Sequence, residues 1–553
     1  MSRMLRSVAG GAGRPAAALV LFVALTICQT WPLATAPGRL TRHDNGDAIL
    51  NEWAIAWVAH QLPRDPLHLF DANIFYPEPE TLALSEHLLL QGVLAMPLLA
   101  GGLSTTLVHN LVLLAGLALS GWAMYLVIVR WTGDSLAGLV AGSLYAFNAH
   151  LMTRTAHLQA MHVEFLPLAV LALDRVLERP TARRALGLAA AFVLQSLASF
   201  YLLVFTAVAL VAAGLSRPVD WWGARFRPRL LALGGAAGLS VLLLLPFLLP
   251  YARAHERGLV RPVEEMLKFS AWGRDYLSSG GWLHFRLWGE RLWTPDSTAL
   301  FPGIAGALLA AAALGSGLAW RDRRARMWLA LGLAGFVLSF GPQVPGYRGL
   351  VTLFPLLEGV RAPVRFGLLP LAAVAALGGF VLARWRQAAG FTRRSTAVAV
   401  LVLVVVNGEA FRGPRVYTPA LEIPGVYDVL RSYPRAVVAD FPMARPSAIF
   451  RNARYMLYST RHWHPILTGY SGFLPPGYEQ RWMRVNQFPK DTALAALVDL
   501  GVTHVVVHDD VDLIGHADRS PGLVRLAGED ATVVYAIRLE AFRPGSTRQP
   551  GGP

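Results

Sequence analysis

The residues best suited to chemistry are two aspartates that flank a glycine shortly after the first apolar run. They stand in the string His43-Asp44-Asn45-Gly46-Asp47. A well-placed carboxylate can take the proton from a hydroxyl group and so activate its oxygen. Aspartate is also a favoured N-cap residue, so either one has the alternative role of starting the helix that follows. We expect Asp47, and next Asp44, to be the catalytic base.

Two arginines near a later apolar run could bind an anion. Arg361 and Arg365 lie in the string Arg361-Ala362-Pro363-Val364-Arg365-Phe366. A guanidinium group binds phosphate through two parallel hydrogen bonds. The alternative is ordinary contact with lipid headgroups. We expect these arginines to be substrate-binding residues.

Four more residues are candidates for substrate contact. Glu86 and His87 precede a short apolar run, and Asp275 and Tyr276 lie in a later polar stretch. A carboxylate at a membrane edge can bind an acceptor or a metal, and aromatic rings can stack on sugars. A solvent-facing charge or simple packing is the alternative for each. The acids that could hold Mg²⁺ or Mn²⁺ are Asp44, Asp47 and Glu86.

A histidine-rich stretch offers a second possible metal site. It contains His150, His157, His162 and Glu164. These side chains have the chemistry of metal ligands, but their spacing matches no ligand signature. Contact with the surface or with headgroups is the preferred interpretation.

The composition predicts a membrane protein. The chain has 553 residues, of which 54% are apolar and 15% are charged. Soluble proteins carry about 25% charged residues, so long apolar runs and scarce charge indicate membrane helices. The net charge of +15 comes almost entirely from arginines in short loops. This is the positive-inside pattern, and it argues against nucleic-acid binding.

The apolar runs predict about eleven transmembrane helices. Their approximate ranges are 15–35, 104–129, 134–152, 160–178, 184–199, 200–216, 229–251, 298–319, 327–345, 366–384 and 395–413. The run from Ala185 to Ser216 could be one helix or two, and the arginine distribution favours two. The N-terminus is then cytoplasmic. Cleavage of a signal peptide near Ala34-Thr35-Ala36 is the alternative, although Pro37 disfavours it.

The topology places a large loop and the C-terminal part outside the cytoplasm. In the loop at 37–103, residues after Asp47 predict an amphipathic helix in the membrane interface, anchored by Trp53 and Trp57. The membrane domain spans 1–413. Short β-branched runs at 436–441, 504–508 and 532–537, with a helix at 492–500, predict an extracytoplasmic α/β domain over 414–542. A disordered tail is expected at 543–553.

Several strings together resemble the GT-C glycosyltransferase superfamily, in a bacterial branch of such membrane proteins. The strings are Gly46-Asp47 leading to Asn51-Glu52-Trp53, Ala72-Asn73-Ile74-Phe75-Tyr76-Pro77, Ser85-Glu86-His87 and Arg361 to Phe366. The resemblance covers about residues 15–410. It implies a mainly α bundle, a polyprenyl-phosphate sugar donor, inversion at the anomeric carbon, and Asp47 or Asp44 as the base. The acceptor would be a glycan, a lipid or a protein outside the bacterial inner membrane.

Two other functions stay open at this stage. A transporter or flippase for a lipid-linked glycan usually has ionisable groups within its spans, whereas here the acids gather near span ends. A non-catalytic membrane assembly protein is the third possibility. The sequence has no P-loop, no HExxH and no CxxC pair, so nucleotide-driven transport has no support.

Overall fold

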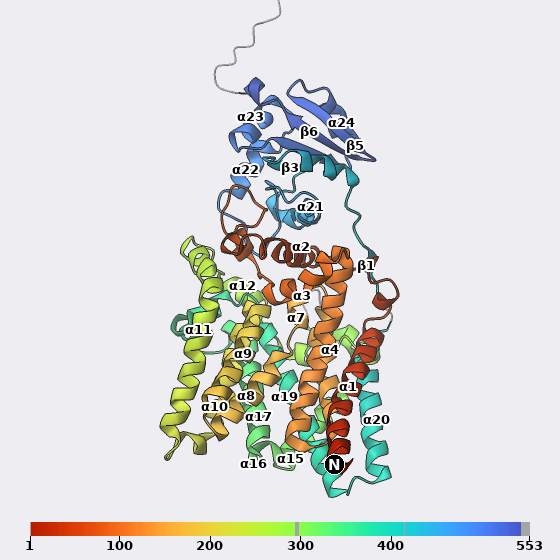
Figure 1. The fold of residues 1–553 in the computed structure, drawn as a ribbon, viewed down its shortest axis with the longest axis vertical. Helices are drawn as coiled ribbons and strands as arrows, with labels where there is room; N and C mark the ends of the chain where they lie inside the picture. The colour runs from red at the N-terminus through yellow and green to blue at the C-terminus, as the bar shows by residue number, and fades with distance from the viewer. Residues whose placement is uncertain (1, 294–297, 414, 543–553) are drawn as a thin grey trace, which may run out of the picture. The chain divides into compact units, whose positions relative to one another are not determined.

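The computed structural model describes residues 2–293, 298–413 and 415–542 (Figure 1). The tail expected at 543–553 lies outside the described residues. The chain forms two compact units. The first comprises residues up to 37, 110–249 and 255–417, and the second comprises 38–109, 250–254 and 418 onward. The large loop after the first helix therefore shares a unit with the C-terminal residues, a grouping that the sequence boundaries did not anticipate.

The first unit is helical. Its main helices are α1 (Ser2–Gln29), α4 (Thr105–Thr132, whose first turn belongs to the second unit), α5 (Ser135–Ala146), α8 (Phe165–Glu178), α9 (Ala182–Ala198), α10 (Phe200–Leu215), α11 (Phe226–Glu256), α15 (Ile304–Gly315), α17 (Arg323–Ser339), α19 (Leu368–Ala388) and α20 (Arg393–Ala410). Within the described residues, three helices are long and apolar enough to cross a membrane: α4, α11 and the segment Pro363–Ala388 that contains α19. The expectation of eleven spans stays a prediction.

The chain breaks at Ser199, as the arginine distribution led us to expect. Ser199 has extended backbone angles, with φ −169° and ψ 139°, so it separates α9 from α10. A residue outside the α region cannot continue the helical hydrogen-bond ladder. The run from 182 to 215 is therefore two helices.

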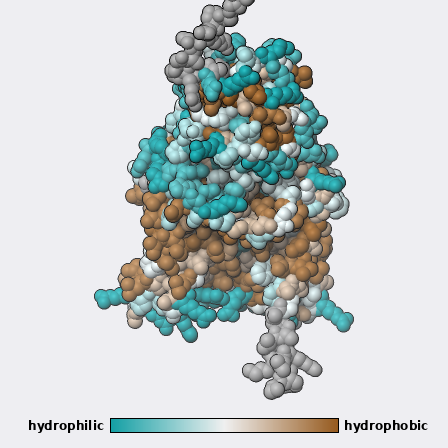
Figure 2. All heavy atoms as spheres, turned by 45° about the horizontal axis from the view of Figure 1, so that its top comes forward, coloured by the Kyte–Doolittle hydropathy of each residue, from teal (hydrophilic) through white to brown (hydrophobic). Residues whose placement is uncertain are grey.

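Apolar side chains cover the outside of this unit. Leu231 and Leu242 on α11 are 76% and 67% exposed, and Val404 on α20 is 62% exposed. Figure 2 shows hydrophobic residues as a brown band over the helical part. Exposed apolar surface on this scale marks an interaction surface, and here the lipid bilayer is the partner.

Buried ion pairs join three loops at one end of this unit. Asp174 near the end of α8 pairs with Arg217, which follows α10, and with Arg324 at the start of α17 at 2.9 Å. Arg217 also contacts Asp220 at 2.6 Å. Such pairs stabilise only when the remaining polar atoms are satisfied, and Trp131 Nε1 donates to Asp174 at 3.0 Å. The network holds the arginine-rich loops together.

The second unit contains the helix that was expected in the membrane interface. This helix, α2 (Gly46–Gln61), packs against α3 (Leu89–Ala100) and α21 (Ala453–Ser459). Trp53 and Trp57 are only 1% and 5% exposed, and their indole N–H groups donate to Asn73 and to Leu69 O. The prediction of interfacial tryptophan anchors was wrong, because the unit itself buries both faces of α2.

A four-stranded sheet completes the second unit. Its order is β3 (Val438–Phe441), β4 (His504–His508), β6 (Thr532–Ile537) and β5 (Leu523–Glu529), with only the β3–β4 pair parallel. Three strands and α23 (Asp491–Asp499) lie where the sequence indicated. Strand β5 was missed, because a bulge between Arg525 and Ala527 disturbs its alternation and much of it is exposed.

Candidate functional site

The helix that follows the acidic loop begins at a different residue from the two proposed in the sequence analysis. The Asn45 side chain accepts a hydrogen bond from the Asp47 backbone N–H at 2.8 Å and is the N-cap of α2. Asparagine is among the preferred cap residues. The alternative role of Asp44 or Asp47 as the N-cap was therefore wrong.

Asp47 is held by the C-terminal part of its own unit. The Tyr470 hydroxyl donates to Asp47 Oδ1 at 2.7 Å. A Cβ added to Gly46 would lie 3.2 Å from Phe450 Cβ and 3.3 Å from a Tyr470 ring carbon, so the loop approaches this wall closely. Asp47 is half-buried. A hydrogen bond from a phenol orients the carboxylate.

Asp44 has a more open environment. Its side chain is 46% exposed and pairs with Arg42 at 2.9 Å. An exposed ion pair of this kind contributes little free energy and is easily broken. Of the two aspartates, Asp47 is therefore the more buried and the more firmly held, and its predicted role as the base stays a prediction.

Sequence reasoning missed a buried carboxylate one turn further along α2. Glu52 is fully buried and accepts hydrogen bonds from His43 Nε2 at 2.7 Å, Thr105 Oγ1 at 2.6 Å and Thr106 Oγ1 at 2.9 Å. His43 Nδ1 accepts from the Leu421 N–H at 3.0 Å, so Nε2 carries the proton that faces Glu52.

This network fixes the geometry around the acidic loop. Burial alone would raise the pKa of Glu52, but the hydrogen bond and charge of His43, with further help from His109 and Thr105, bring it below the usual value. Glu52 therefore stays ionised and ties α2 to the residue before Asp44. The string Asn51-Glu52-Trp53 was visible in the sequence, but only tertiary contacts reveal this role.

Glu86 and His87 lie in the same unit, in a packed setting. His87 is 5% exposed, and its Nδ1 accepts from the Leu89 N–H at 3.0 Å at the start of α3. Burial lowers the pKa of His87 to about 4. The Tyr251 hydroxyl donates to Ser85 O at 2.8 Å. His87 is thus neutral and supports the backbone, and its predicted contact with substrate stays a prediction.

The use of Mg²⁺ or Mn²⁺ stays a prediction. Among the described residues, no group of three or more His, Cys, Asp or Glu side chains could hold a metal ion. The candidate ligands Asp44, Asp47 and Glu86 are thus not gathered into such a set. His162 and Glu164 instead bond to each other at 3.0 Å inside the first unit.

The first unit contains the arginines expected to bind phosphate, each stacked on an aromatic ring. Arg365 lies over the Tyr201 ring at 4.5 Å, and Arg361 lies over the Phe269 ring at 4.7 Å. Arg361 is also paired with Glu265 at 2.7 Å. Stacking holds a guanidinium plane in place while its N–H edges remain free to bind. Arg365 is therefore better prepared for an anion than Arg361.

A third arginine, missed from the sequence, belongs to this cluster. Arg154 follows the short helix α6 (Ala149–Thr153) and donates to Thr298 at 3.3 Å. Burial and then the positive charge of Arg365 lower the pKa of Arg154 to about 9. In the part of the chain that the structure describes, neither arginine is paired with a carboxylate. Two neighbouring unpaired cations stabilise a bound anion.

Asp275 and Tyr276 are occupied with local structure. Asp275 is 3% exposed and accepts from the Trp272 N–H at 2.7 Å and the Thr298 N–H at 3.2 Å. Burial raises its pKa above the usual value despite these bonds. The Tyr276 hydroxyl bonds to Ser339 at 2.9 Å. Asp275 thereby shapes the loop that presents Thr298 to Arg154.

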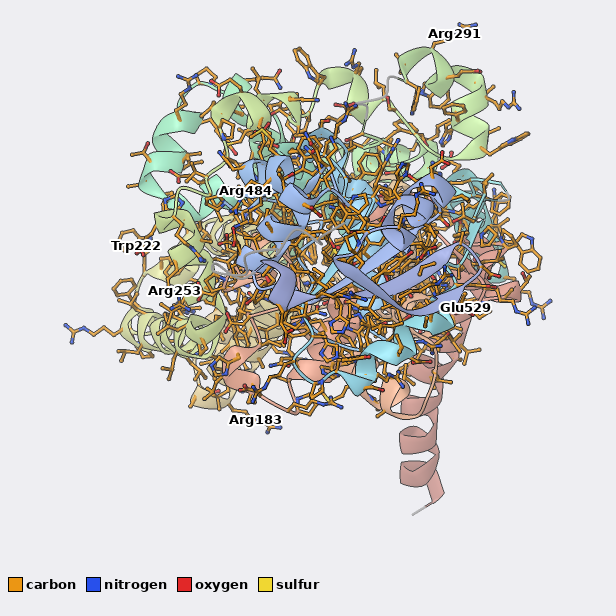
Figure 3. The ribbon with its side chains drawn as sticks, turned by 90° about the horizontal axis from the view of Figure 1, so that it is seen from above. Arg183, Trp222, Arg253, Arg291, Arg484 and Glu529 are labelled. Carbon is orange, nitrogen blue, oxygen red and sulfur yellow. The ribbon has the colours of Figure 1, made fainter. Side chains whose placement is uncertain are left out.

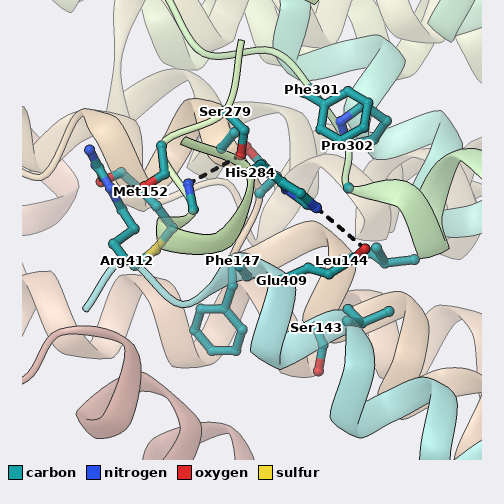
Figure 4. A pocket seen from close by; sticks show the side chains of 17 residues that line it. Ser143, Leu144, Phe147, Met152, Ser279, His284, Phe301, Pro302, Glu409 and Arg412 are labelled. Carbon is teal, nitrogen blue, oxygen red and sulfur yellow. Dashed lines mark hydrogen bonds and ion pairs between the residues drawn. The ribbon is translucent and has the colours of Figure 1, made fainter. Parts of the chain in front are cut away.

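A small cavity in the first unit is lined by a buried histidine and glutamate (Figure 4). His284 Nε2 lies 3.4 Å from Glu409 Oε1, and Glu409 Oε2 accepts from the Ala305 N–H at 3.0 Å. The cavity holds about 30 Å³, which suits a water molecule but no sugar. We regard this pair as part of the packing around the loop before α15.

Among known proteins, this chain matches solved structures but no family model and no curated sequence. The cryo-EM structure of the arabinofuranosyltransferase AftD from Mycobacteria matches with a TM-score of 0.59 and 16% identity, over 95% of this chain and 40% of AftD. A mutant form of AftD matches with a TM-score of 0.56 and 17% identity, over 94% of this chain and 41% of that one.

This chain therefore spans about two fifths of the AftD chains that it matches. A crystal structure of ArnT from Cupriavidus metallidurans also matches, with a TM-score of 0.46 and 15% identity, over 94% of this chain and 97% of that one. The AftD alignments extend over almost all of this chain, so they concern its whole architecture. The chain therefore shares its fold with the matched part of these AftD structures.

Proposed function

We propose that this protein is an integral-membrane glycosyltransferase that moves a sugar from a polyprenyl-phosphate donor to a hydroxyl group of an extracytoplasmic acceptor. The observation that carries the proposal is the pair of unpaired, half-buried arginines, Arg154 and Arg365, in a bundle with the GT-C fold. The phosphodiester of a polyprenyl-phosphate sugar, and the phosphate monoester that leaves after transfer, are anions that such arginines suit. An arginine that only contacted lipid headgroups would not need a second, half-buried arginine beside it, as Arg365 has in Arg154.

In the proposed reaction, the arginines bind the phosphate of the donor and Asp47 binds the hydroxyl of the acceptor. Asp47 removes the proton as the acceptor oxygen attacks the anomeric carbon, with inversion. The polyprenyl phosphate leaves with the bonding electron pair. Because this phosphate is a weak base and its charge is held by guanidinium groups, no general acid is required. Tyr470 keeps the Asp47 carboxylate oriented.

The proposal includes the finer topology of the chain. About eleven helices cross the bacterial inner membrane, the N-terminus is cytoplasmic, and the α/β domain predicted over 414–542 lies outside. The positive-inside distribution of the arginines supports this orientation. The short helices, such as α15 with 12 residues, would span only with the help of flanking turns.

The test is a transfer assay with the purified full-length protein. A panel of polyprenyl-phosphate hexoses and pentoses is incubated with acceptor glycans, and the product is detected by mass spectrometry, with and without a chelator. We expect one donor class to be consumed and the product to form in both conditions. Movement of a lipid-linked glycan across proteoliposomes without any transfer would instead support a flippase, and no activity in either assay would support an assembly role.

A further inference from the structure

A second site lies in the first unit, at the end that carries the arginine-rich loops. A groove of about 550 Å³ opens between α1, α5 and the end of α19. Its apolar wall includes Ala17, Leu136 and Leu139, and its polar end includes Arg14 and Arg386. Ligand sites usually have volumes of about 300–1,000 Å³. Neither the expected active-site residues nor the arginine cluster around Arg154 contributes to it.

The lining of the groove suits both parts of a phospholipid. Its aliphatic wall suits acyl chains, and its guanidinium groups suit an anionic headgroup. Arg386 is 6% exposed, lies 5.5 Å from the Phe391 ring centre, and has an Nη1 without a hydrogen-bond partner among the described residues. A buried guanidinium has lost its hydration, and hydrogen bonds to protein acceptors usually offset that loss. An edge without an acceptor lacks this stabilisation.

An acid beside the groove pairs with one edge of Arg386 and leaves its Nη1 without a hydrogen-bond partner among the described residues. Asp134 Oδ2 lies 3.3 Å from Arg386 Nε, while Oδ1 accepts from the Leu136 and Ala137 N–H groups at the start of α5. This carboxylate is therefore shared between the helix and one edge of Arg386. Arg14 is exposed and adds a second positive charge at the mouth of the groove.

We infer that this groove binds one phospholipid with an anionic headgroup, with the phosphate on Arg14 and Arg386 and the acyl chains along α1 and α5. The lipid belongs to the leaflet that faces the arginine-rich loops. Anionic lipids attract cationic residues by about 1 kcal/mol per arginine near the surface, whereas zwitterionic lipids do not. The site is independent of the proposed transfer reaction.

The test measures lipid retention by the full-length protein. The protein is reconstituted in nanodiscs that contain phosphatidylcholine with or without phosphatidylglycerol, then extracted and analysed by native mass spectrometry. We expect one phosphatidylglycerol molecule to remain bound and phosphatidylcholine to be lost. Arg14→Gln should lower retention about fivefold. Ala17→Trp should abolish it by filling the groove without changing any charge.

The matched control is Arg183→Gln, at an exposed arginine in the first turn of α9 whose side chain lies at the periphery in Figure 3. This variant should retain the lipid as the wild type does. Equal retention by the Arg14, Ala17 and Arg183 variants would overturn the assignment, as would equal retention of phosphatidylcholine. Failure of the wild type to retain any lipid would also overturn it. None of these results depends on sugar transfer.

Discussion

The Tyr470 hydroxyl lies 2.7 Å from Asp47 Oδ1, across 423 positions of the chain. This bond joins the start of α2 to a loop of the C-terminal part within the same unit. It orients one oxygen of the carboxylate and withdraws some of its charge. The acidic loop is therefore built from both ends of the sequence.

Tyr470→Phe should slow sugar transfer about tenfold without abolishing it, because Asp47 keeps its carboxylate but loses an orienting donor. Loss of that donor also removes a stabilisation of the ionised form, so the acidic limb of the rate profile should move to higher pH. The pH dependence of kcat/KM checks both effects. An unchanged profile would mean that Tyr470 only packs against Gly46.

Arg154 and Arg365, which have no carboxylate partner among the described residues, should contribute more to donor binding than Arg361, which is paired. Arg365→Gln and Arg154→Gln should each weaken donor use by about 1.5–3 kcal/mol, or ten- to more than a hundredfold in kcat/KM. Arg361→Gln is the matched control, since Glu265 already occupies this guanidinium at 2.7 Å, and its effect should be smaller. Equal losses in all three variants would argue against a specific phosphate site.

Glu52 should be needed for stability. Glu52→Ala leaves His43, Thr105 and Thr106 without their common acceptor and should cost about 3 kcal/mol, as for other broken buried pairs. Glu52→Gln is milder, because its amide can accept from His43 and donate to the hydroxyls. Thermal unfolding in detergent compares the two variants. A melting temperature of the Ala variant equal to that of the wild type would contradict the role given to Glu52.

His87 should make the second unit sensitive to acid. Its pKa is lowered from 6.5 to about 4 by burial, so between these values the folded state binds fewer protons than the unfolded chain. The contribution of His87 to the free energy of unfolding is unperturbed above pH 6.5. It falls as the pH drops, by about 2 kcal/mol at pH 5. His87→Asn keeps an acceptor for the Leu89 N–H and should flatten this decline. Parallel stability curves for the variant and the wild type between pH 7 and 5 would rule the mechanism out.

Local patterns predicted much of the fold but little of the site. Apolar runs gave most of the long helices, and β-branched runs gave β3, β4 and β6. Hydrogen-bond partners such as Tyr470 for Asp47 and His43 for Glu52 are set by tertiary contacts. The periodicity of apolar residues along the sequence does not reveal them. Trp53 and Trp57 were misread because a helix apolar on most sides is buried in protein, whereas an interfacial helix keeps one polar face.

The central claim is tested most directly by the initial rate of sugar transfer by Asp47→Asn, at saturating donor, relative to the wild type. The asparagine keeps the size of the side chain and can still accept from Tyr470, but it cannot take a proton. The account predicts a loss of about 10²–10⁴-fold in rate, with normal expression and melting temperature. A rate within a few-fold of the wild type would contradict the assignment of Asp47 as the base.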